Sequence, residues 1–160
     1  MRRISASILF FLLVSAFTPQ AYAFAPFVSW WDAESADNGF GVGVKQSVYD
    51  PSFISIEPRA AWYSLDIPGD NANVFPLEAS LLARIAILYG GVGGGFYPAD
   101  RDLKDKLGWF GLVGVEIKLG KLGIFGEGKY TNLETEFKKS GSRIDLSGPA
   151  INVGVRFGGR

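Results

Sequence analysis

The side chains that most often carry enzyme chemistry are missing from this sequence of 160 residues, which has no histidine and no cysteine. Ser-His-Asp and Cys-His nucleophile systems therefore cannot be built. A tetrahedral zinc site with nitrogen or sulfur ligands cannot be built either. We predict no catalytic residue, no metal ligand and no cofactor-binding residue, and we expect a protein that is not an enzyme and needs no cofactor.

Carboxylates are the chemistry that remains. Four glutamates lie in segments where the residues alternate between two faces of a strand, and this alternation would place all four on the same face of a sheet: Glu57, Glu78, Glu116 and Glu127. Two of them could serve as acid and base, but a structural network of salt bridges is the interpretation we favour. The expected members of that charged face are Lys45, Glu57, Arg59, Glu78, Glu116, Lys118, Glu127, Lys129 and Arg156.

Two other motifs were weighed as ligand sites. Asp100, Asp102 and Asp105 offer oxygens to Ca²⁺, but the glycine and terminal glutamate of an EF-hand loop are missing, which favours a solvated loop. The glycines of 91–95 do not match the dinucleotide motif, because Phe96 stands where its last glycine should be. We predict no calcium site and no nucleotide site.

The first 23 residues have the three parts of a secretory signal peptide. Arg2 and Arg3 are basic, 8–14 is an unbroken apolar run, and Ala21-Tyr22-Ala23 is a small-residue exit. The apolar run is shorter than the ~20 residues of a spanning helix, which disfavours the alternative of a membrane anchor. We expect a signal peptide over 1–23 that is removed and one domain over 24–160. That domain is weakly acidic, which gives no reason to expect nucleic acid as a partner.

The domain shows period-two alternation, which is typical of strands. In 109–119, Trp109, Val113 and Ile117 share one uncharged face, while Glu116 and Lys118 lie on the other. Similar segments predict about eight strands, over 25–32, 39–48, 52–65, 75–83, 86–98, 107–119, 122–137 and 143–157.

The predicted connections alternate in length. Odd-numbered ones are longer and polar, and even-numbered ones are tight, such as 49–51 and Gly120-Lys121. This alternation is typical of a membrane barrel with short periplasmic turns on one rim and external loops on the other, with both termini periplasmic. The fourth connection is expected near Arg84-Ile85, with one long bent strand as the alternative because no turn residue marks it.

Alternation alone does not say which face points outward. Apolar faces without charge, a charged face of mixed sign and aromatic residues near strand ends favour a membrane barrel over a soluble one. Glycines on the charged face would leave room there for large neighbours; these are Gly41, Gly43, Gly91, Gly93 and Gly95. The aromatic residues expected at the two membrane interfaces are Trp30, Trp31, Trp62, Tyr63, Phe96, Tyr97, Trp109, Phe110 and Tyr130.

Several short segments together resemble the small outer-membrane β-barrel proteins of the OmpA/OmpX-like, porin-family type. They lie at 28–32, 89–97, 126–130 and 146–157. The resemblance implies an all-β, eight-stranded antiparallel up-and-down transmembrane barrel in the cell outer membrane, with no shared enzymatic activity. The outer-membrane barrel enzymes that act on lipid A resemble each other in using a histidine, so the absence of histidine argues against an enzyme of that kind. One departure is that Phe157 is followed by Gly158-Gly159-Arg160, whereas such proteins usually end on an aromatic residue.

The sequence leaves three functions open. The first is a structural or surface-interaction barrel, expected as a monomer, with outer-membrane lipid, lipopolysaccharide and the barrel-insertion machinery as partners. The second is a narrow pore for ions or small solutes, although an eight-stranded barrel is normally filled by side chains. The third is a soluble periplasmic or secreted barrel that binds an apolar ligand.

Overall fold

A computed structural model describes residues 23–48, 53–67, 70–99, 103–138 and 141–158 of the chain. The predicted signal peptide (apart from Ala23), the turn at 49–51, Asp100, Asp102 and 159–160 lie outside these residues. Within the described part, no helix is long and apolar enough to span a membrane. The regular elements are β1 (Phe24–Trp31), β2 (Asp37–Gln46), β3 (Ile54–Ile67), β4 (Asp70–Val74), β5 (Leu77–Ile85), β6 (Leu88–Tyr97), β7 (Lys106–Leu119), β8 (Leu122–Asn132), β9 (Glu134–Glu136), β10 (Arg143–Asp145) and β11 (Gly148–Phe157).

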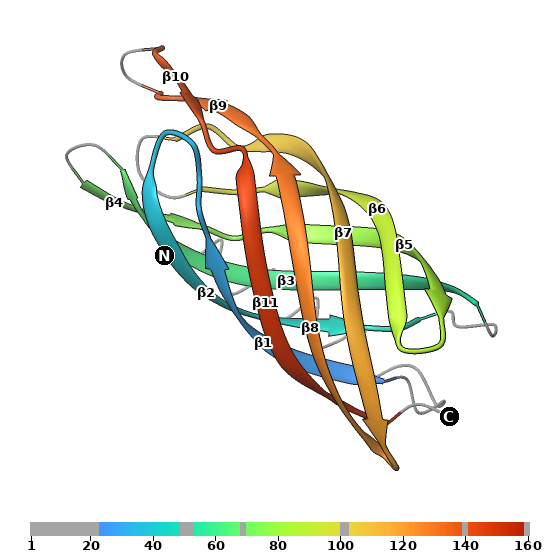
Figure 1. The fold of residues 1–160 in the computed structure, drawn as a ribbon. Helices are drawn as coiled ribbons and strands as arrows, with labels where there is room; N and C mark the ends of the chain where they lie inside the picture. The colour runs from blue at the N-terminus through green and yellow to red at the C-terminus, as the bar shows by residue number, and fades with distance from the viewer. Residues whose placement is uncertain (1–22, 49–52, 68–69, 100–102, 139–140, 159–160) are drawn as a thin grey trace.

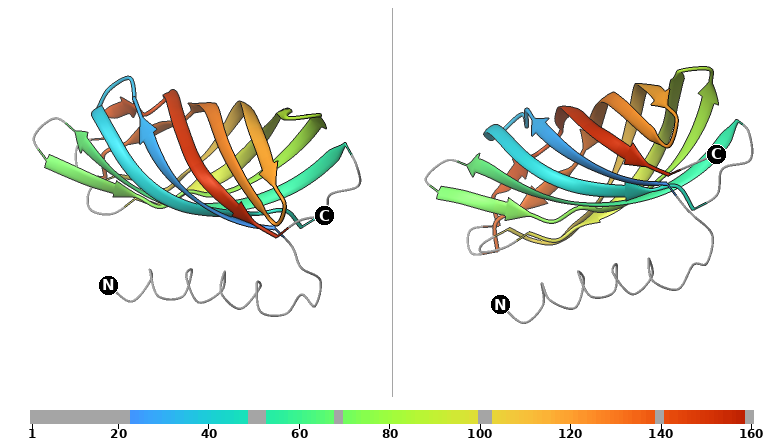
Figure 2. Two further views of the ribbon diagram at one scale, coloured as in Figure 1. Left: turned by 60° about the horizontal axis from the view of Figure 1, so that its bottom comes forward. Right: turned by 90° about the horizontal axis from the view of Figure 1, so that it is seen from below.

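Eight of these strands close into an antiparallel barrel (Figure 1). β1, β2, β3, β5, β6, β7, β8 and β11 each pair with the next along the chain, and β11 pairs with β1. Phe24, at the start of β1, is paired with Phe157, at the end of β11, so both ends of the barrel lie at the same rim. The predicted eight-stranded up-and-down barrel is therefore confirmed, and Figure 2 shows its closed wall from two further sides.

The register of the strand pairs sets the tilt of the barrel. A path around the barrel can be followed from a residue of β1 to its partner on β2, and on from strand to strand. When it returns to β1 it arrives about ten residues closer to the C-terminal end than it began, and this displacement is the stagger of the barrel. For eight strands this stagger corresponds to a tilt of about 40° from the barrel axis. The interior of such a barrel is just wide enough for side chains to fill.

The two faces of each strand follow the sequence alternation. On β7, Trp109, Val113 and Ile117 are exposed on the outer wall, while Phe110 and Glu116 are buried inside. β11 behaves in the same way, with Ile151 and Val153 outside and Asn152 inside. Apolar residues therefore cover the outside of the wall, and the mixed-charge face is enclosed.

The connections follow the predicted alternation in part. One end, called here the turn rim, carries the start of β1, the end of β11 and the β2–β3, β5–β6 and β7–β8 connections. The other end, the loop rim, carries the connections β1–β2, β3–β5, β6–β7 and β8–β11. The β5–β6 and β7–β8 connections are tight, but the β2–β3 connection at 47–53 is longer than the β1–β2 connection at 32–36, so the prediction of a tight second connection is wrong. Two hairpins extend the wall there, because β4 pairs with β3 and β9 pairs with β10.

The structure corrects three predicted boundaries. The segment 66–73, expected as a loop, contains the end of β3 and most of β4. The predicted strands 122–137 and 143–157 are each interrupted, at Leu133 and at Leu146-Ser147, where Leu146 N donates to the Leu133 carbonyl at 2.9 Å and Leu133 N donates to Ser147 Oγ at 3.0 Å. The fourth connection is Ala86-Ile87 rather than Arg84-Ile85, since Ile85 pairs with Leu88. The alternative of one long bent strand is therefore wrong.

Candidate functional site: the charged lumen and the apolar outer wall

Among the residues that the structure describes, nine charged side chains are enclosed inside the barrel. Eight of them are at most 7% exposed, and the side chain of Arg84 is 15% exposed. The four acids are Glu57, Glu78, Glu116 and Glu127, and the five bases are Lys45, Arg59, Arg84, Lys129 and Arg156. The prediction that Lys118 belongs to this group is wrong, because Lys118 is exposed beside the β7–β8 turn. Arg84 was missed because the sequence placed a turn at this residue, whereas β5 continues through it to Ile85.

Nearest the turn rim, two acids and two arginines form a closed ring of ion pairs. Glu57 lies 3.3 Å from Arg84 and 2.7 Å from Arg156, and Glu116 lies 3.1 Å and 3.0 Å from the same two guanidinium groups. Arg156 also donates to Ser47 Oγ at 2.9 Å. This ring joins the neighbouring strands β3 and β5 to β7 and β11 across the lumen, and β7 and β11 pair with neither of them nor with each other.

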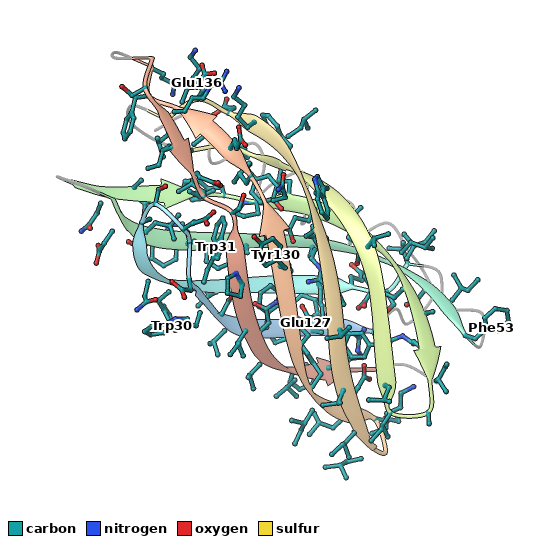
Figure 3. The ribbon with its side chains drawn as sticks, turned by 45° about the horizontal axis from the view of Figure 1, so that its top comes forward. Trp30, Trp31, Phe53, Glu127, Tyr130 and Glu136 are labelled. Atoms are coloured by element: carbon teal, nitrogen blue, oxygen red, sulfur yellow. The ribbon has the colours of Figure 1, made fainter. Side chains whose placement is uncertain are left out.

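Glu127, labelled in Figure 3, is the centre of a second group. It accepts hydrogen bonds from Lys45 Nζ and from an Arg59 guanidinium nitrogen, both at 2.6 Å. It also accepts from the Tyr89 hydroxyl at 3.0 Å and from Asn152 Nδ2 at 2.8 Å. One carboxylate from β8 thereby binds side chains from four other strands.

Glu78 completes the charged lumen on the side of the loop rim. It accepts hydrogen bonds from Lys129 Nζ and from the Tyr97 hydroxyl, both at 2.7 Å. Lys129 Nζ also lies 5.1 Å from the ring centre of Phe110, and Lys45 Nζ lies 3.9 Å from that of Phe125. Cation–ring contacts of this kind are strengthened when water is excluded.

Glycine makes room for these rings, as the sequence predicted for the inward face. A Cβ atom at Gly93 would collide with the Phe110 ring, and one at Gly41 would lie 2.5 Å from the Tyr63 ring. Large side chains from one strand thus lie over bare backbone of the next.

Beyond Tyr97, toward the loop rim, the interior becomes apolar. Trp31 and Tyr63 meet edge to face, with ring centres 5.1 Å apart. We call the whole buried cluster the loop-side core; it consists of Trp31, Ala33, Tyr63, Leu65, Ala72, Val74, Tyr97, Leu103, Leu133, Ile144, Leu146 and Ala150.

The structure corrects the predicted positions of four aromatic residues. Trp31, Tyr63, Tyr97 and Phe110 point into the barrel. Each follows another aromatic residue in the chain, and neighbouring residues on a strand face opposite sides. The outward partners, together with Tyr130, form what we call the outer girdle: Trp30, Trp62, Phe96, Trp109 and Tyr130.

The outer wall below the girdle is a tall apolar band. It includes Val113, Leu81 and Val92, which are 70%, 54% and 64% exposed. Trp109 to Leu119 covers about 33 Å of β7 at about 3.3 Å per residue, which a tilt of about 40° reduces to about 25 Å, the height of the apolar band of outer-membrane barrels. Near the turn rim the band carries a second set of exposed rings, at Phe24, Phe53 and Phe157.

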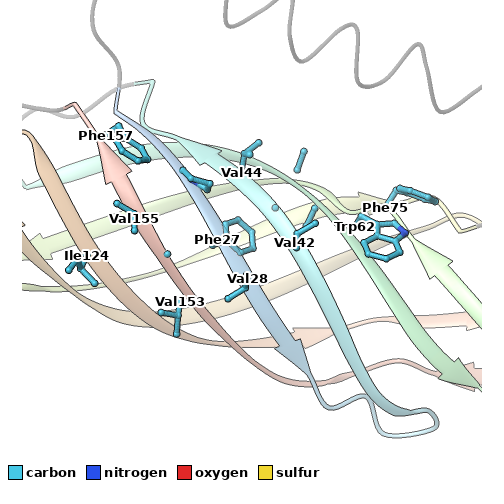
Figure 4. Close-up of a pocket in the computed structure, with 15 residues that line it drawn as sticks. Phe27, Val28, Val42, Val44, Trp62, Phe75, Ile124, Val153, Val155 and Phe157 are labelled. Atoms are coloured by element: carbon cyan, nitrogen blue, oxygen red, sulfur yellow. The ribbon is translucent and has the colours of Figure 1, made fainter.

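An open apolar pocket lies on this wall, over β1, β2, β3, β8 and β11 (Figure 4). Its lining includes Val42, Val44, Val153 and Val155, together with the Trp62 ring. Its lining residues include no charged side chain, so the pocket suits hydrocarbon rather than a polar ligand.

The described residues hold no group of three or more acidic side chains that could bind a metal ion. Asp105, the described member of the three aspartates weighed for calcium, accepts a hydrogen bond from the backbone N of Ala99 at 3.3 Å. The glycine run lies within β6, in the barrel wall. All four lumen carboxylates accept hydrogen bonds from cationic groups, an arrangement in which they bind cations rather than share a proton as an acid–base pair does.

No protein-family model matches the sequence, and no curated protein matches it either. The fold has solved counterparts. The Neisserial surface protein A (NspA) matches with a TM-score of 0.69 and 14% identity, over 86% of this chain and 96% of that one. The Yersinia pestis outer membrane protein Ail (0.53, 12%, 86% and 99%) and the outer membrane protein AlkL (0.51, 14%, 87% and 88%) also match. The chain therefore has the fold of the small eight-stranded outer-membrane barrels.

Proposed function

We propose that this protein is a non-conducting barrel of the cell outer membrane with a structural or surface-interaction role. The turn rim and both chain ends would face the periplasm, and the loop rim would face the outside. The first 23 residues would direct export and be removed. The partners expected are outer-membrane lipid, lipopolysaccharide and the barrel-insertion machinery, and the barrel would act as a monomer.

The observation that carries this proposal is the inverted distribution of polarity. Lys45, Glu57 and Arg59 are at most 2% exposed inside the barrel, while Val113, Leu81 and Ile151 are more than half exposed on its wall. Water around that wall would be costly, because each Å² of apolar surface exposed to water costs about 25 cal/mol. Hydrocarbon around the wall removes this cost, which favours the membrane barrel over the soluble one.

A closed lumen is favoured over a pore by two layers of side chains. The ion-pair ring of Glu57, Glu116, Arg84 and Arg156 fills the end near the turn rim, and the loop-side core fills the other end. Each buried charge is held by an opposite one, and breaking such pairs is costly. An enzymatic role gains no support from either layer, since the carboxylates are engaged by cations.

Insertion and conductance test the proposal. Wild-type protein added to phospholipid vesicles should fold, show heat-modifiable gel mobility and leave planar bilayers without discrete conductance steps. Val113→Arg or Val115→Arg should block insertion, because arginine on the lipid face near midplane costs about 2–4 kcal/mol. Val113→Leu should insert normally. Full assembly of both arginine variants would overturn the membrane-facing wall, and steady single-channel steps from the wild type would overturn the closed lumen.

A further inference from the structure

The apolar pocket on the outer wall has a recessed floor. Five of its lining residues form one row across five strands: Ala60, Val44, Pro26, Val155 and Ile124. Pro26 stands opposite Val155 because the next residue of β1, Phe27, pairs with Gly154. The first four members of the row are only partly exposed, whereas the outward valines Val92 and Val113 elsewhere on the wall are 64% and 70% exposed. The row therefore lies deeper than the wall around it, and we call this recess the wall groove.

The wall groove follows from the residues on β1 and β3. Ala60 places only a methyl group on the outside of β3. Pro26 has no N–H to donate to β11, and the pairing of β1 with β11, present between Phe24 and Phe157, resumes only at Phe27. The outer surface is therefore low, and the strand pairing interrupted, at the seam that closes the barrel.

The wall groove runs obliquely down the barrel. Trp62 and Phe75 lie at one end, and Ile124 lies at the other (Figure 4). Between β3 and β8 the floor row crosses about 19 Å, at about 4.8 Å for each pair of neighbouring strands. Because the strands tilt by about 40° from the barrel axis, this row descends about 12 Å toward the turn rim. The groove therefore begins at the outer girdle and ends within the apolar band, where Ile124 pairs with Ile117.

The chemistry of the lining favours a hydrocarbon chain over a protein partner. Trp62 has the one polar atom among the lining side chains, and its Nε1 already donates to Asn73 Oδ1 at 3.1 Å. Proteins that associate within lipid are held by close packing and by hydrogen bonds between side chains, and the lining offers no free donor or acceptor for such a bond. A chain of methylene groups needs none, because dispersion contacts along its length suffice.

We propose that the wall groove binds one unbranched acyl chain of a lipid in the leaflet at the loop rim. The chain enters beside Trp62, at the girdle level where the acyl chains of that leaflet begin, and follows the floor row toward Ile124. Hydrocarbon already surrounds the wall, so the chain is held by the added contact that a recess gives rather than by exclusion of water. The inference rests on the proposed membrane location and adds a specific lipid site to it.

Photo-cross-linking tests the proposal. The protein is folded in vesicles of diphytanoylphosphatidylcholine, whose chains carry methyl branches, with a minor fraction of straight-chain phosphatidylcholine that bears a diazirine on one chain. After illumination, mass spectrometry of peptides locates the label. We expect the floor residues to be labelled about fivefold more than Val92 and Val113, the ratio that about 1 kcal/mol of added contact supplies. Labelling in proportion to exposure would give the opposite ranking, because Val44 and Val155 are less exposed than either valine.

The position of the diazirine identifies the leaflet from which the chain comes. A diazirine near the ester should label Val42, and one at the end of the chain should label Ile124. The reverse pattern would mean that the chain comes from the leaflet at the turn rim, and it would overturn the proposal.

Variants that fill the wall groove separate the possible failures. Ala60→Phe, or Val155→Phe from the other side of the seam, should abolish the enrichment, whereas Ala79→Phe, at an outward alanine of β5 outside the lining, should leave it unchanged. Equal labelling around the wall, or enrichment that survives both filling variants, would overturn the site. Strong labelling of Val113 with a groove that stays unlabelled would mean that another occupant, such as a second copy of the chain, covers it. If no residue of the outer wall is labelled, the membrane location itself fails.

Discussion

Strand β3 passes through two regions of opposite character, and the outer girdle separates them. Below the girdle, Glu57 and Arg59 are buried inside while Ile56 faces out. Above it, Tyr63 and Leu65 are buried inside while Asp66 faces out. The first arrangement suits hydrocarbon around the wall, and the second suits water. The outward side of one strand therefore changes from apolar to polar at the girdle. This change alone, without reference to any other protein, indicates where the apolar band of the wall ends.

The two regions also differ in how they are held together. The charged lumen is joined by ion pairs that cross from strand to strand, such as Arg156 to Glu57 at 2.7 Å. Buried pairs of this kind add little net stability over apolar packing, but loss of one partner is severe. The loop-side core is held by apolar packing, which tolerates changes of shape better than loss of volume. The lumen should therefore be the more fragile of the two regions toward single substitutions.

The largest expected effect is at Glu127. Glu127→Gln leaves Lys45 and Arg59 enclosed without their shared carboxylate, and we expect a loss of about 3–5 kcal/mol in the free energy of unfolding. Urea unfolding of the barrel folded in vesicles measures it. Lys118→Gln, which removes an exposed charge, is the matched control and should change little. An unchanged unfolding midpoint for Glu127→Gln would remove the distinction between the two regions.

A substitution in the loop-side core should cost less. Leu65 is fully buried there, and Leu65→Ala should lower the free energy of unfolding by about 2–4 kcal/mol through lost burial and a cavity. Leu81→Ala, on the outer wall, is the control of the same chemistry and should cost less than half as much. A cost at Leu81 equal to that at Leu65 would mean that the core is not packed as described.

The double variant sharpens the comparison further. Glu127 and Leu65 belong to separate clusters with no shared partner, so the effects of the two substitutions should add within about 0.5 kcal/mol. Urea unfolding of the double variant beside both single variants gives the coupling energy. A coupling well above that value would show that the lumen and the core unfold as one tightly linked unit.

The sequence predicted the barrel wall well, because period two assigns each residue to a face and the connections reveal the two rims. It did not reveal the loop-side core. The pairs Trp30-Trp31 and Trp62-Tyr63 were both assigned to the interface, although a strand can present only one member of each pair outward. Arg84 was missed for a related reason: no glycine, proline or asparagine marks the β5–β6 turn, so nothing in the sequence separates the last inward residue from the turn.

That turn supplies a smaller prediction, next to the ion-pair ring. Ala86 has a φ of 54°, a left-handed conformation that costs about 1 kcal/mol for a residue with a Cβ. Ala86→Gly should raise the free energy of unfolding by about that amount. Gly120, with a φ of 67° and no atom near its absent Cβ, is the reverse control. If Gly120→Ala, which should lower stability to a similar extent, had no effect, turn strain would not matter at this rim.

The smallest expected effect is a local response of the loop rim to acid. Hydrogen bonds and attraction from Lys104, and attraction from Lys106, keep the pKa of Glu136 below its ordinary value. Hydrogen bonds from Ser147 do the same for Asp145. A carboxyl group whose folded-state pKa is depressed stabilises the structure above its unfolded pKa, and that contribution is lost as pH falls through the folded value. Between neutral pH and about pH 5 the β9–β10 hairpin should therefore be unaffected, and below about pH 4 it should loosen.

Hydrogen exchange at the backbone amides of Lys104 and Phe137, which donate to the carbonyls of Glu136 and Ser142, reports on this loosening. Both amides should exchange faster below about pH 4 once intrinsic rates are corrected, while amides of β7 and β8 within the barrel wall keep their protection. In Glu136→Gln the amide of Lys104 should be less protected at neutral pH and should lose much of its acid response. The opposite order would contradict this prediction: amides of the barrel wall would lose protection at a higher pH than the amides of the hairpin. In that case the enclosed ion pairs, rather than the exposed ones, would be the first contacts that acid breaks.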